Sequence, residues 1–321
     1  MNRRCVLQML LGSAMAGSAS AQKILTVAYL GSAGLEKEYV AAFRRGLADH
    51  GYVIDQNIEV LFRAAEGDFS RLPAIFAEAT ARKLDALVVV GNQAALFAQA
   101  ANLSLPIVFV IGADPVDLGL AANYSKPTGN MTGITFYTGA LAEKRLEFLN
   151  ELLPPNIPAA VLFNPETPQL AVQKSTFESA ARALGRPVVF VPVASGEQFD
   201  ELDHKLREIN AGGFVYSTDP FFNFHRAKLV ALAKRLRVPA VYSGREYIEF
   251  GGLMAYGSVQ PEAYRLGGNY LGRVLKGERV ESLPIVRSSR FELLLNLKAA
   301  GELGISFTPR QFALADEVVD N

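Results

Sequence analysis

Residues 24–51, ILTVAYLGSAGLEKEYVAAFRRGLADHG, contain one complete strand-and-helix unit. Residues 24–31 form a continuous apolar run, which is typical of a strand buried on both faces of a parallel sheet. The run is followed by apolar residues at every fourth position, which share one face of a helix that Gly51 would end. These apolar residues are Leu35, Tyr39, Phe43 and Leu47. The stretch therefore predicts a buried strand followed directly by an amphipathic helix.

The same unit recurs along the chain. In the first half we predict strands at 58–62, 86–90 and 107–111, with helices at 69–83 and 93–101. After the turn-rich residues 128–133, we predict helices at 141–153, 168–184, 197–209 and 224–236, and strands at 159–163, 187–192, 213–217 and 240–243. Alternation of this kind predicts parallel sheets covered by helices. Two doubly wound, Rossmann-like α/β lobes are the main interpretation, and a single large sheet is the alternative.

Composition excludes several classes of protein. Half of the 321 residues are apolar, yet no run is long enough to span a bilayer. The 32 basic residues equal the 32 acidic ones, so nothing indicates binding to nucleic acid or to an anionic membrane. We therefore expect a soluble globular protein with no nucleic-acid partner.

The first 21 residues have the pattern of a cleavable signal peptide. Arg3 and Arg4 form a basic start, residues 6–15 form a short apolar run, and residues 19–21 form an A-x-A site that predicts cleavage before Gln22. We therefore expect export to the periplasm, by the Sec or the twin-arginine route. Cys5 precedes the apolar run, so the mature protein would contain neither a lipid anchor nor a cysteine.

Polar residues follow the predicted strands, at the edge where ligands of open α/β sheets bind. Many of them also begin a helix, where free N–H groups favour a carboxylate or phosphate. Helix capping is the alternative role for each Ser, Asn, Thr or Asp among them. The candidate ligand-binding residues are Ser32, Gly34, Asn92, Gln93, Asp114, Asn164, Thr167, Thr218, Asp219, Arg245 and Glu246, together with Tyr137 at the lobe junction.

Arg245 is the candidate partner for a ligand carboxylate, because a guanidinium can hold a carboxylate by two parallel hydrogen bonds. Aromatic residues such as Phe136, Tyr242 and Tyr247 could line a cleft for a flat apolar group, although core packing is their alternative role.

Catalysis finds little support in the sequence. There is no Gly-x-Ser-x-Gly elbow, no phosphate-binding Gly-Lys-Ser/Thr loop and no metal-ligand spacing among the three histidines. Asp219 and Glu246 could in principle act as an acid–base pair. We predict no catalytic residue, no metal and no cofactor.

Three segments carry a resemblance to a known family: residues 129–133 (GNMTG), residues 239–242 (PAVY) leading to 251–257 (GGLMAYG), and residues 291–300 (FELLLNLKAA). Together they resemble the substrate-binding proteins of ABC transporters, in the branch that includes tryptophan and tyrosine binders. The resemblance implies the type I periplasmic-binding-protein fold. Two lobes would be joined by three crossing segments, near 134–138, 251–258 and 284–292. Lobe 1 would comprise residues 22–136 and 253–288, and lobe 2 residues 137–252 and 289–321.

The resemblance also implies a function. A monomer would bind a small carboxylate-bearing ligand between its lobes and deliver it to an ABC permease in the inner membrane. An aromatic amino acid and an aromatic or small organic acid both remain open, because the loop after the first strand, residues 31–35, is shorter than in the aromatic amino acid binders. The alternatives are an exported hydrolytic enzyme on a two-lobed α/β scaffold and a ligand sensor for a membrane receptor.

Overall fold

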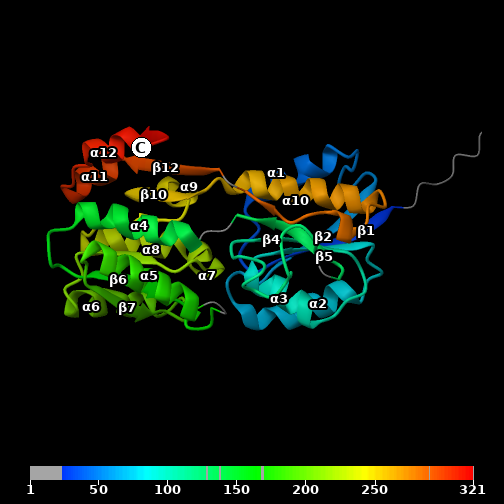
Figure 1. The fold of residues 1–321 in the computed structure, drawn as a ribbon, viewed down its shortest axis with the longest axis horizontal. Helices are drawn as coiled ribbons and strands as arrows, with labels where there is room; N and C mark the ends of the chain where they lie inside the picture. The colour runs from blue at the N-terminus through cyan, green and yellow to red at the C-terminus, as the bar shows by residue number, and fades with distance from the viewer. Residues whose placement is uncertain (1–23, 128, 137–138, 168–169, 289, 321) are drawn as a thin grey trace, which may run out of the picture.

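Two α/β lobes lie side by side along the long axis of the molecule (Figure 1). The computed structural model describes residues 24–320 except 128, 137–138, 168–169 and 289. Each lobe has a central sheet with helices on both faces, and within the described residues no sheet extends from one lobe into the other. The prediction of two doubly wound lobes is therefore confirmed, and the alternative of a single large sheet is wrong.

The first lobe contains a six-stranded sheet in the order β11-β5-β4-β3-β1-β2, in which every neighbouring pair is parallel. The apolar runs of the sequence form its centre because parallel strands are covered on both faces. Its strands are β1 (Leu25–Gly31), β2 (Ile58–Ala64), β3 (Ala86–Val90), β4 (Ile107–Ile111), β5 (Met131–Thr135) and β11 (Val286–Arg287).

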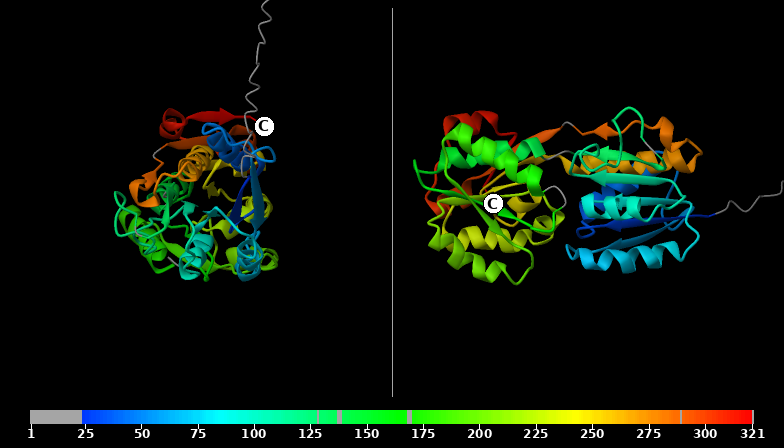
Figure 2. Two further views of the ribbon diagram at one scale, coloured as in Figure 1. Left: turned by 90° about the vertical axis from the view of Figure 1, so that its right-hand side faces the viewer. Right: turned by 60° about the horizontal axis from the view of Figure 1, so that its bottom comes forward.

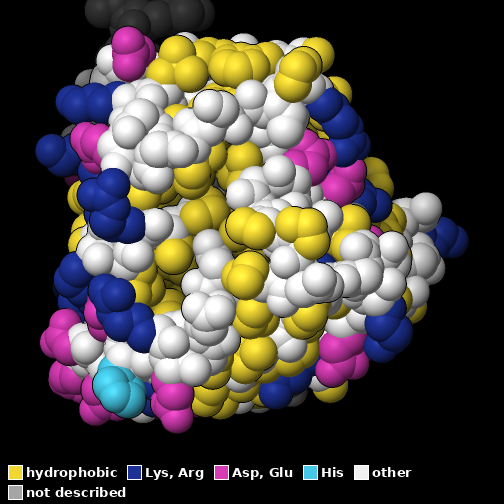
Figure 3. Space-filling model, turned by 90° about the vertical axis from the view of Figure 1, so that its left-hand side faces the viewer, with side chains coloured by type: hydrophobic (Ala, Val, Ile, Leu, Met, Phe, Trp, Pro, Cys, Tyr) yellow, Lys and Arg dark blue, Asp and Glu magenta, His cyan; other side chains and the backbone are white. Residues whose placement is uncertain are grey.

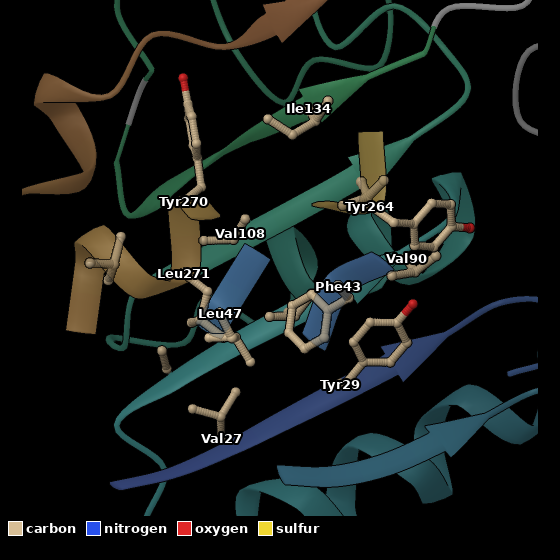
Figure 4. Close-up of a cluster of buried hydrophobic side chains, with 14 of the residues drawn as sticks. Val27, Tyr29, Phe43, Leu47, Val90, Val108, Ile134, Tyr264, Tyr270 and Leu271 are labelled. Carbon is tan, nitrogen blue, oxygen red and sulfur yellow. The ribbon is translucent and has the colours of Figure 1, made fainter. Parts of the chain in front are cut away.

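Two pairs of helices cover the two faces of this sheet (Figure 2). Figure 4 shows how Phe43 and Leu47 of one helix and Leu271 of another pack over the central strands. On this face lie α1 (Lys37–Ala48) and α10 (Gln260–Leu275), and on the other lie α2 (Leu72–Thr80) and α3 (Asn92–Ala100). Short 3-10 helices occur at Phe69–Arg71 and Val280–Ser282.

Close contact between α1 and α10 depends on two glycines. A Cβ atom at Gly46 would clash with the backbone oxygen of Arg265 in α10, and one at Gly268 would clash with the backbone oxygen of Phe43 in α1. The helices can approach closely only because these positions lack side chains. As a result, a helix from residues 260–275 completes the lobe that begins at the N-terminus.

The second lobe is built from two groups of strands that one parallel bridge, between Phe214 and Ala240, links side by side. The groups have the orders β7-β6-β8 and β9-β10-β12-β13, and only the β10–β12 pairing is antiparallel. The strands are β6 (Ala159–Phe163), β7 (Val188–Pro192), β8 (Gly213–Tyr216), β9 (Val241–Tyr242), β10 (Met254–Ser258), β12 (Phe291–Asn296) and β13 (Glu317–Val319).

Helices cover both faces of this sheet too. One face packs against α4 (Gly139–Leu152), α5 (Leu170–Leu184) and α11 (Leu297–Leu303), and the other against α6 (Phe199–Glu208), α7 (Pro220–Phe224), α8 (Arg226–Leu236) and α9 (Arg245–Glu249). The last helix is α12 (Pro309–Leu314). At the end of this lobe remote from the first, hydrophobic side chains lie between charged ones (Figure 3).

The chain passes between the lobes after β5, after β10 and after β11. The second crossing corrects the predicted boundary at residue 253: β10 pairs with β9 and β12, so residues 254–258 belong to lobe 2 and lobe 1 resumes only beyond them. Gly257 in β10 allows a close backbone approach at this crossing, since a Cβ there would overlap the carbonyl oxygen of Ser243.

Among the described residues, no helix combines the length and apolar character that a membrane span requires. The predicted signal peptide lies outside the described residues.

Candidate functional site

A cavity of about 50 Å³ lies where the strand ends of the two lobes face one another. Its walls combine apolar and aromatic side chains with amides, a hydroxyl and one carboxylate. They are Ala33, Val90, Gly91, Asn92, Gly112, Phe136, Gln260 and Tyr264 from lobe 1, and Thr218, Asp219, Pro220 and Asn223 from lobe 2. Tyr264 lies beside Val90 at one end of the lobe 1 core, so the core continues into the cavity wall (Figure 4).

Asp219 is the buried carboxylate of this cavity, only 3% exposed. It is the N-cap of α7 and accepts a 2.7 Å hydrogen bond from the Phe221 backbone N–H. The Thr167 hydroxyl donates to its Oδ2, and the Asn164 Nδ2 donates to its Oδ1 at 3.5 Å. Burial raises the pKa of Asp219 above its usual value, although these donors oppose the increase. The carboxylate is therefore held in place at a considerable desolvation cost.

Gln93 connects this carboxylate to the other lobe. Its Nε2 donates to Asp219 Oδ2 at 3.3 Å, while its buried Oε1 has no hydrogen-bond partner among the described residues. The predicted residues Gln93, Asn164, Thr167 and Asp219 therefore meet in one cluster across the two lobes. An unpaired buried acceptor is costly, and Gln93 is not among the residues that line the cavity, so its amide serves the contact between the lobes.

Other predicted residues shape the loops of lobe 1. The Ser32 hydroxyl accepts a 2.9 Å hydrogen bond from Ala94 N–H, so it satisfies the start of α3. Asn92 Oδ1 accepts from the N–H groups of Gly112 and Ala113, at 3.2 Å each, and its Nδ2 has no partner among the described residues. Ser32 therefore caps a helix, which was the alternative to ligand binding in the sequence analysis. Asn92 lines the cavity and retains a free donor there.

Two further predicted residues, Asp114 and Gly34, lie apart from the Asp219 cluster. Asp114 accepts from Val116 N–H and from the Tyr124 hydroxyl, at 2.8 Å each, and so fixes its own loop. Gly34 faces the Phe224 ring of the opposite lobe. Tyr137 lies outside the described residues.

Arg245 is already paired within its own lobe. It lies in the first turn of α9, and its guanidinium forms ion pairs with Glu292 at 2.7 Å and Glu317 at 2.8 Å. The hydrogen bond to Glu292 is the main cause of the raised pKa of Arg245. Arg245 is not among the residues that line the Asp219 cavity, so the structure gives it no position beside a ligand there.

A second cavity, of about 210 Å³, lies beside the second and third crossing segments, which we call the hinge side of the cleft. Arg245 and Glu246 line it, together with Tyr39, which stacks on Tyr264 with 4.5 Å between ring centroids. Gln260 lines both cavities, so the Tyr39–Tyr264 stack lies between them. Burial raises the pKa of Glu246 to about 7, which leaves this carboxyl partly protonated near neutral pH.

The lobes are also joined by an ion pair beside the cleft. Glu36, before α1, accepts two hydrogen bonds of 2.9 Å from the Arg226 guanidinium of α8. Arg226 also lies over the Phe250 ring, 5.3 Å from its centroid. Together with the contact between Gln93 and Asp219, this pair joins the two lobes across the cleft.

Sequence reasoning missed Arg145, which is fully buried in α4. Its Nη2 lies 3.4 Å from the Thr218 hydroxyl oxygen, and Thr218 lines the cavity. Its place in the sequence gave a signal, because Arg145 falls on the apolar stripe that includes Ala142, Leu146 and Leu149.

Comparison with known proteins identifies the family. A family model described as ABC transporter substrate binding protein matches residues 26–319. The chain belongs to the ABC transporter substrate-binding protein family. The resemblance noted in the sequence is therefore confirmed, and the role of this family is to bind a solute.

Individual members of this family are distant in sequence. The chain is 23% identical to the tyrosine-binding protein of Clostridioides difficile strain R20291 over 279 residues, which are 86% of this chain and 80% of that protein. An ABC domain from Streptococcus pneumonia, solved in complex with L-Trp, has a TM-score of 0.83 at 22% identity and covers 92% of this chain and 100% of its own. A ligand-free, open substrate-binding protein with adhesive properties from Clostridium difficile has a TM-score of 0.64 at 20% identity, covering 93% and 100%.

These likenesses confirm the type I periplasmic-binding-protein fold of this substrate-binding protein. In the part of the chain that the structure describes, no three His, Cys, Asp or Glu side chains converge as metal ligands. The polar groups at the cavity are hydrogen-bond donors and acceptors on both lobes, an arrangement that suits binding of a small molecule.

Proposed function

We propose that this protein is exported and binds a small carboxylate-bearing ligand, an aromatic amino acid or an aromatic or small organic acid, between its lobes for delivery to an ABC permease. The mature chain would begin at Gln22, act in the periplasm as a monomer, and catalyse no reaction.

The observation that carries this proposal is the cavity with walls from both lobes. Asn92 of lobe 1 lines it together with Thr218 and Asp219 of lobe 2, and Gln93, which lies outside the lining, joins the lobes by donating to Asp219. A ligand in this position would contact both lobes at once. Its binding energy would therefore favour the closed arrangement over the open one.

The chemistry of the walls supports a ligand with a flat apolar part. Phe136 and Tyr264 are more than nine-tenths buried and line the cavity together with Pro220. The cavity of about 50 Å³ holds only a few water molecules, so the lobes must move apart to admit an aromatic ring. The relatives in complex with L-Trp or named for tyrosine binding support the same ligand class.

Mass spectrometry of the small molecules released from purified, denatured protein tests the ligand class. We expect an aromatic or small carboxylic acid, with or without an amino group, in near-stoichiometric amount. Calorimetry with L-tyrosine, L-tryptophan, 4-hydroxyphenylacetate and phenylacetate should then give saturable binding of one or more, and a released sugar or polyamine with no binding of these acids would contradict the proposal.

Export, delivery and lack of catalysis need separate measurements. N-terminal sequencing of the exported protein should begin at Gln22, and deletion of the gene should abolish high-affinity uptake of the identified ligand. The ligand should be recovered chemically unchanged after prolonged incubation. Turnover that disappears in Asp219→Asn would favour the hydrolytic alternative instead.

A further inference from the structure

Arg145 is a buried cation without a counterion. Its side chain is 0% exposed, and it forms two hydrogen bonds, both 3.4 Å long, to the Tyr256 backbone oxygen and to the Thr218 hydroxyl oxygen. Its Nε has no partner among the described residues, and none of their carboxylates lies within ion-pair distance of it. A guanidinium has five N–H donors, so most of its hydrogen-bonding capacity is unused.

Such an arrangement is costly unless it serves a purpose. Burial lowers the pKa of Arg145, with only tyrosine hydroxyls nearby to oppose the decrease. Uncompensated buried charges usually cost several kcal/mol, and an apolar residue of similar volume is often more stabilising. Packing alone therefore does not explain why an arginine occupies this position.

Arg186 provides a comparison within the same lobe. It is 8% exposed, but it donates to Asn150 Oδ1 at 2.7 Å and to the backbone oxygens of Pro154 and Ile157 at 2.6 and 2.7 Å. Those bonds are of ordinary length and tie three turns of chain together, which is a structural role. The contacts of Arg145 are longer and fewer, and one of them leads towards the ligand cavity.

Thr218 connects Arg145 to that cavity. The side-chain amide of Gln173 fixes its backbone, accepting from Thr218 N–H at 2.8 Å and donating to Thr218 O at 3.1 Å. The hydroxyl oxygen accepts from Arg145, and the hydroxyl proton has no acceptor among the described residues. With the Arg145 guanidinium donating to one of its two lone pairs, this hydroxyl keeps its proton free to donate towards the cavity.

Building on the proposed function, we propose that Arg145, acting through the Thr218 hydroxyl, makes the interlobe cavity select ligands that present a carboxylate oxygen to Thr218. Arg145 is a positioning residue in this scheme, because Thr218 and not Arg145 lines the cavity. The guanidinium orients the hydroxyl and supplies positive potential in a poorly hydrated site, where both effects favour an anionic acceptor. In this scheme the positive charge that favours the ligand carboxylate comes from Arg145. It does not come from Arg245, which is already paired with Glu292 and Glu317.

The test compares two acids with their uncharged amides. Calorimetry would measure binding of L-tyrosine against L-tyrosinamide, and of 4-hydroxyphenylacetate against 4-hydroxyphenylacetamide, to the parent and to Arg145→Met. We expect the parent to prefer the acid of at least one pair, and Arg145→Met to reduce that acid-to-amide affinity ratio by about 10- to 100-fold. A purely structural role would weaken both members of a pair equally.

Three further variants identify the route. Thr218→Val should lose the same preference with Arg145 intact, and Thr218→Ser should keep it. The double variant, Arg145→Met with Thr218→Val, should differ little from Thr218→Val alone because both changes act on one contact. Arg186→Met is the matched control, which should lower the thermal midpoint without changing the acid-to-amide ratio. If Arg145→Met does not fold, the two single Thr218 variants still decide the question.

The results separate the inference from the function on which it rests. A parent protein that binds neither acid refutes the proposed ligand class, and with it the carboxylate assigned to Thr218. A parent that prefers an acid, while Arg145→Met and Thr218→Val retain its acid-to-amide ratio within about threefold, refutes only the role of Arg145 and Thr218.

Discussion

Glu246 should make the stability of this protein depend on pH between about 4.5 and 7, because burial raises its pKa from 4.5 to about 7. The carboxyl lies near Tyr39 and Glu36 of lobe 1 and Arg226 of lobe 2; Glu36 raises the pKa further, whereas Arg226 and a hydrogen bond from Tyr39 oppose the increase. Since the pKa in the folded protein is the higher one, folding takes up a proton in this range. The free energy of unfolding therefore falls as the pH rises from 4.5 to 7.

The size of the effect follows from the pKa difference. Each pH unit corresponds to about 1.4 kcal/mol, which gives about 3 kcal/mol as an upper value. Glu246 also lines the 210 Å³ hinge-side cavity, where water can screen its charge. We therefore expect ionisation of Glu246 to lower the free energy of unfolding of the parent protein by about 1–3 kcal/mol above pH 7, and to have no effect below pH 4.5.

Replacement by glutamine removes this titration. Urea denaturation of the parent and Glu246→Gln at pH values from 4 to 8 should show that the variant gains about 1–3 kcal/mol relative to the parent across this range. Glu249→Gln, which replaces an exposed carboxylate on the same helix, is the matched control. If the difference between Glu246→Gln and the parent stays constant with pH within about 0.5 kcal/mol, the reasoning is refuted.

Three more changes test the cleft and the crossing. Arg226→Met removes the ion pair with Glu36, so ligand affinity should weaken by about 3- to 10-fold at low salt and less at 1 M salt; calorimetry that shows no salt-dependent difference would contradict a role in closure. Asp219→Asn should weaken an amino acid ligand by at least about tenfold but leave its deaminated analogue nearly unchanged, and equal losses in calorimetry would show that Asp219 meets no ammonium group. Gly257→Ala should lower the free energy of unfolding by about 1–3 kcal/mol in urea denaturation because its Cβ overlaps Ser243 O, and an unchanged midpoint would show that the strands can separate without cost.

Much of the fold could be predicted because buried parallel strands have a simple sequence pattern. The predicted strands at 86–90, 107–111 and 159–163 coincide with β3, β4 and β6. The same pattern could not assign β10, whose sequence MAYGS includes a glycine and a serine, to a lobe. Its place depends on pairing with β9 and with β12, which lies more than thirty residues later in the chain.

The candidate site was predictable only where position along a strand determines position in space. Asn92, Thr218 and Asp219 line the cavity because each follows a parallel strand whose carboxyl end faces the cleft. Arg245 also follows a strand, but Glu292 and Glu317, which neutralise it, come from distant segments. Long-range pairing of this kind leaves no local trace in the sequence.

The return of residues 260–275 to lobe 1 has a consequence for synthesis of the chain. Phe43 and Leu47 of α1 pack over the central strands beside α10, which the ribosome makes more than 200 residues after α1. Until then this face of the first-lobe sheet lacks its second helix, and the apolar positions that α10 covers stay open. The amino-terminal half of the chain can therefore complete this part of its core only near the end of translation.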